Sequence, residues 1–524
     1  MLLLGEIVRR HARYRGSRLA YVLDHADGNV ERVTYAELDE GTNRLAHTLA
    51  AHGVRRGDRV AILAQNCVEY PWTYFACCKL GAIVVPVNTR YQRGEIEHAI
   101  QFSEARIVLV GAEFLEDVRA LVAGGTLPDV DTVLAIDGDP TYEERSGRVR
   151  FAALAPLLAA ADATEPAPAD PPDERDPHVM LYTSGTTGKP KGALLSQRTY
   201  YLQSGVVHAL GGLTERDIGL SMFPMFHMGG WATPLGYWSA GGTAVVMRRA
   251  DPAAMLRAVE RERVTYLYAV PTVYESMLAR PDFASHDFSS LHLLGGGTAY
   301  MPREQIDRIT KSFGVDAMLI LYGQTEAGPV TCLRSYQLAA KAGSVGTPVN
   351  HVDVRLVDDA GNEVPDGTPG EIVVKSDLTM LGYWKMPEAT AAAYEGGWLH
   401  TGDLAVRDDD GFLHIAGRSK EMIKSGGENI FPAEIEQLLR THPGVGECAV
   451  LGVPDDHWGE SVLVVIVPRA EARLGEADIV QWVRERVAGY KKPRHVRFVE
   501  ELPRTASTRQ VQKTMLRERF LAGW

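Results

Sequence analysis

Residues 183–192 place glycine, hydroxyl and lysine side chains in one short segment directly after an apolar run. Glycines let backbone N–H groups approach an anion, hydroxyls add hydrogen-bond donors, and lysine adds positive charge. The segment is not a Walker loop, because Gly185 and Gly188 enclose two residues rather than four and a proline follows the first lysine. We expect it to bind a polyphosphate through Thr183, Ser184, Gly185, Thr186, Thr187, Gly188 and Lys189.

Three later apolar runs also end in glycine-rich or polar clusters. These clusters cover residues 224–230, 295–299 and 322–328. In an open α/β sheet, ligands bind outside the carboxyl ends of the strands. Together with the phosphate segment, these clusters predict four strand ends that line one crevice.

The segment YTSGTTGKPKG at 182–192 resembles the phosphate-loop signature of the adenylate-forming superfamily, which contains acyl-CoA synthetases, peptide-synthetase adenylation domains and luciferases. Further segments match in order: YGQTE at 322–326, GWLHTGD at 397–403, GRSK at 417–420 and SGGENIFPAE at 425–434. The resemblance covers essentially the whole chain. It implies a two-step reaction in which ATP and a carboxylate give an acyl-adenylate and pyrophosphate, and a thiol then takes the acyl group.

The resemblance also implies roles for individual nucleotide-site residues. Glu326 is expected to bind Mg²⁺, which favours one or two carboxylates together with phosphate oxygens. Thr183 and Glu326 are expected to be catalytic. The other expected nucleotide contacts are Gly295, Gly296 and Gly297 through close backbone approach, Tyr322 against adenine, Gly323, Gln324, Thr325 at the α-phosphate, Asp403 at the ribose hydroxyls, and Arg418 at ribose or phosphate.

A second set of residues is assigned to the acyl and thiol steps by the same resemblance. His227 matches an aromatic gate near the carboxylate and is expected to be catalytic. Trp231 and Gly297 are expected to shape the acyl pocket, although core packing explains Trp231 nearly as well. Lys420 matches the hinge about which the small domain swings. Ser425, Gly426 and Gly427 are expected at the thiol step.

One family motif is altered near the C-terminus. The family supplies a lysine from a Gly-Lys pair, and its charge stabilises the attack of carboxylate on the α-phosphate. Here Thr508-Arg509-Gln510 stands in that place, while Lys513 follows and is expected to be a surface lysine. Arg509 keeps the charge in a planar group of different reach, so it is not an equivalent replacement. Three explanations are open: Arg509 partly replaces the lysine as the catalytic cation, the loop is altered so that it traps one state, or the enzyme has diverged toward a different activation.

Apolar strand-like runs alternate with helical patterns and must position these residues. We expect strands at 60–63, 83–87 and 106–110, helices at 69–80 and 94–103, and a surface linker at 161–177. A helix at 432–440, strands at 448–453 and 461–467, and a helix at 477–488 follow. This rhythm predicts an α/β fold. The expected architecture is a large N-terminal domain of mixed β-sheets and helices, residues 1–417, and a small mobile α+β domain, residues 418–524.

Composition excludes several classes of protein. The chain has 524 residues and a formal net charge of −12, which argues against general nucleic-acid binding. Its five cysteines show no metal-ligand spacing, and their low number favours a reducing compartment. The first residues do not predict a signal peptide, and no apolar run is long enough for a membrane span. We therefore expect a cytoplasmic enzyme, with an oligomer compatible with the sequence.

The sequence thus favours an ATP- and Mg²⁺-dependent carboxylate–CoA ligase of fatty acid metabolism or of aromatic acids. Its expected partners are ATP, coenzyme A and a small-molecule carboxylate. Two alternatives stay open. One is adenylation of another oxyanion or carboxylate, such as nitrite, for attack by an amine. The other is a low-turnover protein that binds nucleotide or acyl-adenylate, which the altered lysine motif favours.

Overall fold

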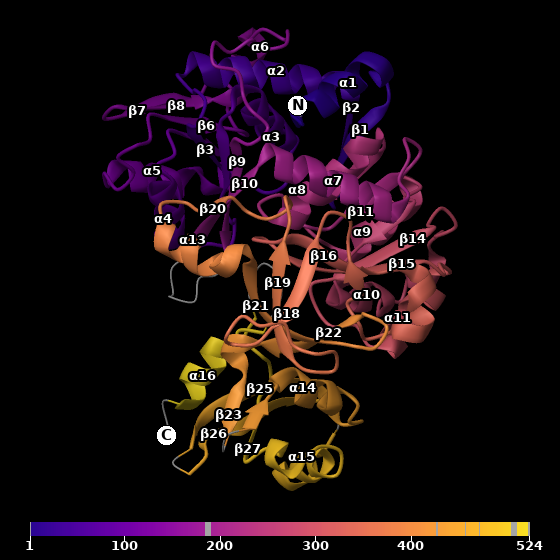
Figure 1. Cartoon of the computed structure of the whole chain (residues 1–524). Helices are drawn as coiled ribbons and strands as arrows, with labels where there is room; N and C mark the ends of the chain where they lie inside the picture. The colour runs from indigo at the N-terminus through magenta and orange to yellow at the C-terminus, as the bar shows by residue number, and fades with distance from the viewer. Residues whose placement is uncertain are drawn as a thin grey trace. The chain divides into compact units, whose positions relative to one another are not determined.

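The computed structural model describes residues 2–183, 190–425, 428–455, 457–470, 472–504 and 511–521 (Figure 1). The chain divides into two compact units. Unit 1 contains Met1–Gly343, Pro348–Asp353 and Lys375–Leu399, and unit 2 contains Ser344–Thr347, Val354–Val374 and His400–Trp524. The expected boundary at 417/418 is that of a domain that moves, whereas the two units are defined by their internal contacts. The expected boundary therefore stays a prediction.

Two nine-stranded sheets form the centre of unit 1. The first has the order β17-β16-β15-β14-β13-β11-β12-β1-β2, and the second has the order β20-β10-β9-β4-β3-β5-β6-β8-β7. The strands of the first are β1 (Leu19–Asp24), β2 (Val30–Thr34), β11 (Ile218–Ser221), β12 (Thr243–Met247), β13 (Tyr266–Tyr268), β14 (Leu293–Gly297), β15 (Met318–Gln324), β16 (Gly328–Leu333) and β17 (Thr347–Pro348). Those of the second are β3 (Arg59–Leu63), β4 (Ile83–Pro86), β5 (Ile107–Val110), β6 (Thr132–Ala135), β7 (Glu143–Ser146), β8 (Val149–Ala153), β9 (Pro177–Thr183), β10 (Lys191–Ser196) and β20 (Gly382–Tyr383).

Unit 1 contains the two helices that the sequence predicts in this part of the chain. The helix expected at 69–80 has those bounds in the structure, and the one expected at 94–103 begins one residue earlier. The helices are α1 (Gly5–Arg15), α2 (Tyr35–Ala51), α3 (Glu69–Leu80), α4 (Arg93–Ser103), α5 (Leu115–Ala123), α6 (Leu154–Ala160), α7 (Gln197–Gly211), α8 (Met228–Ala240), α9 (Pro252–Arg261), α10 (Pro271–Leu278), α11 (Arg303–Phe313), α12 (Leu338–Lys341) and α13 (Pro387–Ala393).

The four strand ends predicted to line one crevice come from two sheets rather than one. β11, β14 and β15 belong to the first sheet, whereas β9 belongs to the second. β11 and β14 run parallel to β13, and β15 runs parallel to β14 and antiparallel to β16. β14 and β15 also continue into their clusters, through Gly297 and Gln324, because the glycines pair in register with the neighbouring strand. The apolar runs end at Leu294 and Leu321, and the strands extend beyond them into the clusters.

The linker at 161–177 is held by side chains of helices α2 and α3 and of the turn before β3. The ammonium group of Lys79, which is 3% exposed, donates to Asp39, Asn43 and Glu165 at 2.8, 2.6 and 2.7 Å. Arg56 forms ion pairs with Asp170 and Asp176 of the same segment. The linker is therefore a surface strap with defined contacts rather than a loose connection.

Unit 2 contains a four-stranded and a five-stranded sheet. The four-stranded sheet has the order β18-β19-β21-β22, with β18 (Asp353–Val357), β19 (Gly370–Lys375), β21 (Leu399–Arg407) and β22 (Leu413–Arg418). The five-stranded sheet has the order β24-β23-β26-β25, and β27 pairs with β26. Its elements are β23 (Ile423–Ser425), β24 (Glu428–Ile430), α14 (Pro432–Arg440), β25 (Val445–Asp455), β26 (Gly459–Pro468), α15 (Glu476–Arg484), β27 (His495–Phe498) and α16 (Lys513–Leu521).

Strands β25 and β26 are buried on both faces. Alternate residues pack into two apolar clusters: Val450 lies in one with Ile435 of α14 and Ile479 of α15, while Leu451 lies in the other with Leu516 of α16. This explains why their sequences read as nearly continuous apolar runs. The predicted α/β fold, with mixed sheets in the larger part and an α+β arrangement at the C-terminal end, is confirmed.

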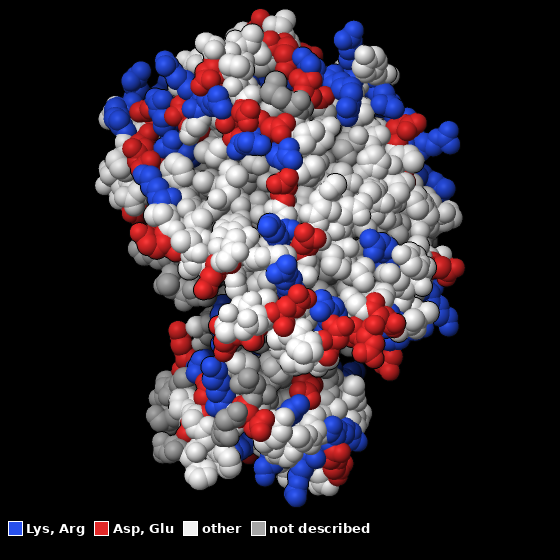
Figure 2. Space-filling view, viewed as in Figure 1, with Lys and Arg blue, Asp and Glu red and all other residues white. Residues whose placement is uncertain are grey.

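Of the helices in the described ranges, none combines the length and the apolar character that crossing a bilayer requires. The face drawn in Figure 2 carries Lys and Arg interspersed with Asp and Glu. That face therefore has no continuous basic patch of the kind that binds a nucleic acid.

Candidate active site

Glu326 lies where the end of the first sheet of unit 1 meets the second. It follows β15 by two residues, and its Oε1 accepts a hydrogen bond of 2.9 Å from Oγ1 of Thr183, the last residue of β9. The Tyr383 hydroxyl donates to the same oxygen at 3.0 Å. The structure thus brings together the two residues that the sequence assigns to the phosphate loop and to the metal.

The Glu326 environment fits Mg²⁺ by its donor chemistry. Within the described ranges, no group of three or more His, Cys, Asp or Glu side chains could hold a metal ion. A single carboxylate suits Mg²⁺, which keeps several waters and takes its other ligands from substrate phosphates. Glu326 is the residue that would hold the ion, and the ion would supply charge stabilisation on the phosphates.

The phosphate segment connects two antiparallel strands. Lys191 pairs with Thr183 and Gly192 with Tyr182, so the segment spans the turn of the β9–β10 hairpin. This differs from a Walker loop, in which a helix follows the strand. Ser184, Gly185, Thr186, Thr187, Gly188 and Lys189 lie outside the described residues, and their phosphate contacts stay predictions.

The glycines of β14 have a packing reason in addition to the expected ligand role. A Cβ atom at Gly295 would lie 2.3 Å from Cδ2 of Tyr268, and one at Gly297 would lie 2.4 Å from the carbonyl oxygen of Leu321. Gly296 is crowded in the same way by the sulfur of Met301. Side chains are excluded at these positions by the protein itself, and nucleotide contact there stays a prediction.

The YGQTE motif forms the end of β15 and the turn that follows it. Tyr322 and Gly323 pair with β16, and Gln324 pairs with Gly328. Thr325 lies in the turn with Glu326. The backbone N–H of Met380 donates to the Glu326 carbonyl oxygen at 2.7 Å, which holds this turn against the segment that carries Tyr383.

His227 stands at the N-terminus of α8, but its side chain does not cap the helix. Its Nε2 is buried and has no hydrogen-bond partner among the described residues. Burial, and then the charge of Arg90, lower the pKa of His227 to about 4. The imidazole is therefore neutral at pH 7, and the role of His227 as a gate near the carboxylate stays a prediction.

Trp231 has the packing of a core residue. It is 0% exposed, and its ring stacks on Tyr74 with centroids 4.1 Å apart and lies edge-on to Phe75 at 4.9 Å. The core interpretation accounts for these contacts in full, and a part for Trp231 in the acyl pocket stays a prediction.

Asp403 and Arg418 lie together in unit 2. They are register partners in β21 and β22, and Arg418 Nε lies 3.0 Å from Asp403 Oδ1. The Asp403 side chain is buried, whereas that of Arg418 is half exposed. The pair places a carboxylate acceptor beside a cationic donor, and the ribose and phosphate roles of these residues stay predictions.

The predicted hinge lies between the two sheets of unit 2. Lys420 is an exposed residue of the short 3₁₀ turn η5 (Ser419–Glu421), which connects β22 with β23. Ser425 ends β23 and is buried, and its register partner is Glu428 of β24. Gly426 and Gly427, between these two strands, lie outside the described residues.

Lys513 is not the solvated surface lysine that the sequence suggests. Its Nζ lies 2.7 Å from Glu436 Oε1 and 3.0 Å from Glu421 Oε2, and its side chain is 20% exposed. Burial alone would lower the pKa of Lys513, but the two carboxylates outweigh it and raise the pKa above its usual value. Thr508, Arg509 and Gln510 lie outside the described residues.

Tyr383 is a site residue that the sequence analysis missed. It stands in a Gly-Tyr-Trp segment, which carried no recognised motif, and contacts Glu326 across 57 positions of the chain. Burial, followed by the Glu326 charge, raises the pKa of Tyr383, so its hydroxyl stays protonated and donates. No local pattern in the sequence marks this contact, because its partner is distant in the chain.

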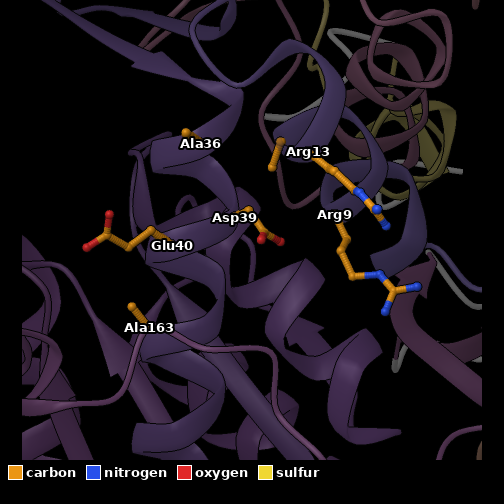
Figure 3. A pocket seen from close by; sticks show the side chains of 7 residues that line it. Arg9, Arg13, Ala36, Asp39, Glu40 and Ala163 are labelled. Carbon is orange, nitrogen blue, oxygen red and sulfur yellow. The ribbon is translucent and has the colours of Figure 1, made fainter.

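The cavity in Figure 3 lies elsewhere in unit 1. It has a volume of about 490 Å³ and is lined by Arg9, Ala12 and Arg13 of α1, by Ala36, Asp39 and Glu40 of α2, and by Ala163. It contains none of the predicted site residues. Asp39 is already paired with Lys79.

Comparison with known proteins agrees with the site. Residues 8–384 match the AMP-binding enzyme family, and residues 434–509 match the AMP-binding enzyme C-terminal domain. A feruloyl-CoA synthase from Amycolatopsis is 41% identical over 495 residues, covering 93% of this chain and 94% of that protein. The indoleacetate–CoA ligase of Aromatoleum aromaticum is 38% identical over 508 residues, covering 96% and 95%.

A solved structure of a fatty acyl CoA synthetase from Mycobacterium tuberculosis has a TM-score of 0.80 and 34% identity, covering 100% of this chain and 99% of that one. The chain therefore belongs to the AMP-binding enzymes of the adenylate-forming superfamily, as an acyl-CoA synthetase of the AMP-forming acid–thiol ligase class. The resemblance and the enzyme class expected from the motifs are confirmed.

Proposed function

We propose that this chain joins an aromatic or fatty carboxylic acid to coenzyme A through an acyl-adenylate, with ATP as the energy source and Mg²⁺ as the metal. The observation that carries the proposal is the 2.9 Å hydrogen bond between Thr183 and Glu326. It joins the strand that leads into the phosphate loop to the carboxylate suited to Mg²⁺. A metal-bound triphosphate needs that juxtaposition.

The reaction has two bond exchanges. A carboxylate oxygen bonds to the α-phosphorus of ATP while the bond to the bridging oxygen breaks, which releases pyrophosphate. The CoA sulfur then bonds to the acyl carbon, AMP leaves, and the thiol proton passes to solvent. His227, neutral at pH 7, would donate an N–H to the acid without contributing a fixed charge.

The acid class rests on two considerations. The relatives are named for ferulate and indoleacetate, which are aromatic acids, and the similar structure is named for fatty acids. Residues 226–230 contain no acidic side chain that could hold an α-ammonium group, which disfavours amino acids. Arg509 is proposed to take the place of the usual adenylation lysine.

The test is ATP–pyrophosphate exchange over a panel of hydroxycinnamates, indole acids and fatty acids, followed by thioester detection with CoA. Exchange with one acid class, and CoA-dependent thioester with the same class, is the expected result. Exchange that yields product only with an amine would favour the alternative acceptor. Nucleotide binding without exchange on any acid would favour the low-turnover alternative, which the replaced lysine supports.

A further inference from the structure

We propose that Tyr383 is a positioning residue for the metal-binding carboxylate; this rests on the proposed function of Glu326. The Tyr383 hydroxyl lies 3.0 Å from Glu326 Oε1, and the Thr183 hydroxyl lies 2.9 Å from the same atom. Both hydrogen bonds end on Oε1 rather than on Oε2. Two donors from different strands thus fix the rotation of one carboxylate.

The chemistry of these two donors suits a metal ligand. A lysine or arginine beside Glu326 would neutralise its charge and compete with the cation. Neutral hydroxyls orient the carboxylate and leave its negative charge available to Mg²⁺. Outer partners of this kind change metal affinity by about 10- to 100-fold when removed.

Tyr383 is itself held by the strand that follows the phosphate loop. It pairs with Ala193 of β10, and the Trp384 N–H donates to the Gly192 carbonyl oxygen at 2.8 Å. The Lys191 ammonium lies 4.8 Å from the centre of the Tyr383 ring. The Tyr383 side chain therefore connects the far end of the phosphate hairpin to the carboxylate, as Thr183 connects the near end.

The same segment supplies a matched control. Tyr394 lies in the chain just after α13, and its hydroxyl donates to the backbone carbonyl of Met380 instead of to Glu326. Tyr383→Phe and Tyr394→Phe each remove one oxygen atom and one hydrogen bond. They differ in whether the lost bond ends on the carboxylate.

The experiment measures ATP binding by calorimetry over a range of Mg²⁺ concentrations, with no acid present. For Tyr383→Phe we expect the Mg²⁺ concentration that gives half of the maximal increase in ATP affinity to rise about tenfold. For Tyr394→Phe we expect a rise below about twofold. With the accepted acid, pyrophosphate exchange by Tyr383→Phe should return to near the wild-type rate when Mg²⁺ is in excess. Both variants should melt within a few degrees of the wild type.

The outcomes separate this inference from the proposed function. If the wild type binds ATP in a Mg²⁺-dependent way and Tyr383→Phe matches it, Tyr383 has no positioning role and the proposed function stands. Equal shifts in the two variants would assign the effect to general loosening of the segment and overturn the inference. If the wild type shows no Mg²⁺-dependent ATP binding, both proposals fall.

Discussion

At the scale of single residues, the proposed metal site depends on one carboxylate, that of Glu326. We expect Glu326→Gln to keep the shape of the side chain and an oxygen that can accept from Thr183 and Tyr383, while removing the charge that attracts Mg²⁺. ATP–pyrophosphate exchange should fall on the order of 100-fold at low Mg²⁺. Glu326→Ala should fall at least as far. Exchange at the wild-type rate in a folded variant would remove Glu326 from the metal site.

The altered lysine motif gives a second prediction at this scale. Replacing Thr508-Arg509-Gln510 with Gly-Lys should speed adenylation on the order of 100-fold and leave thioester formation from supplied acyl-adenylate unchanged. Lys513 is already ion-paired with Glu421 and Glu436, which neutralise its charge. It is therefore a poor substitute for the lost lysine. Rapid-quench measurement of each half-reaction checks this.

Two single variants identify the working cation if the chain already adenylates as fast as the Gly-Lys version. Arg509→Ala should then abolish adenylation. Lys513→Ala should lower the stability of unit 2, because it leaves two carboxylates facing each other, without a specific loss of the first step. Loss of adenylation in Lys513→Ala alone would contradict the role inferred from its ion pairs.

Single residues differ in how well the sequence predicts them. Thr183 and Glu326 were found because their motifs name them, and the structure brings their side chains into contact. Tyr383 was not found, since a hydroxyl that contacts a distant carboxylate leaves no local pattern. The Lys513 pairing was missed for the same reason: Glu421 and Glu436 are separated from it by most of unit 2.

At the scale of elements, the buried Lys79 ammonium connects α3 to α2 and to the 161–177 strap. Lys79→Ala would leave the Asp39 and Glu165 carboxylates without their cation. Breaking a buried ion pair in this way costs about 3–5 kcal/mol. Urea unfolding should show that loss. Arg56→Ala removes ion pairs to the same strap that are more exposed, so it should lower the free energy of unfolding much less. An equal loss in the two variants would show that the stability comes from holding the strap and not from the buried ammonium of Lys79.

Periodicity predicts elements well where burial is regular. The bounds of α14 match the sequence because it has a clear apolar face and an early proline. α3 is buried on nearly all sides, and its bounds are marked instead by Glu69 at its start and by Gly81 after its end. β14 and β15 extend past their apolar runs because glycines continue the pairing where the sheet excludes a side chain. At Gly295 of β14 the neighbour is Tyr268, and at Gly323 of β15 it is the carbonyl oxygen of Gly328. α15 ends at Arg484, four residues before the predicted end.

At the scale of the whole molecule, buried histidines make stability depend on pH. Burial lowers the pKa of His178 to about 3, and burial with Arg90 lowers that of His227 to about 4. Between these values and the ordinary 6.5, the unfolded chain binds more protons than the folded one, so stability is lost as pH falls below about 6.5.

We expect each of these two histidines to cost on the order of 2 kcal/mol of folding stability on going from pH 7 to pH 5. Urea unfolding at the two pH values measures their sum together with two further contributions. Burial lowers the pKa of His11 to about 4, which adds to the loss, and burial raises the pKa of Glu69 to about 7, which offsets part of it. The test is therefore the difference between variant and wild type. His178→Gln should be less stable at pH 7 but should lose less between pH 7 and pH 5. A variant that loses as much as the wild type would contradict the burial-lowered pKa of His178.

The movement of a C-terminal domain about Lys420 is the last expectation at this scale. Lys420 is exposed in a short turn between β22 and β23, so a substitution there changes the backbone without disturbing a core. Lys420→Pro fixes φ and removes an N–H. Thioester formation from supplied acyl-adenylate should then fall more than adenylation does, because only the second step requires the swing. Lys420→Ala, which removes the charge but keeps the backbone free, should affect both steps little. Equal loss of the two half-reactions in Lys420→Pro, or no loss, would place the hinge elsewhere.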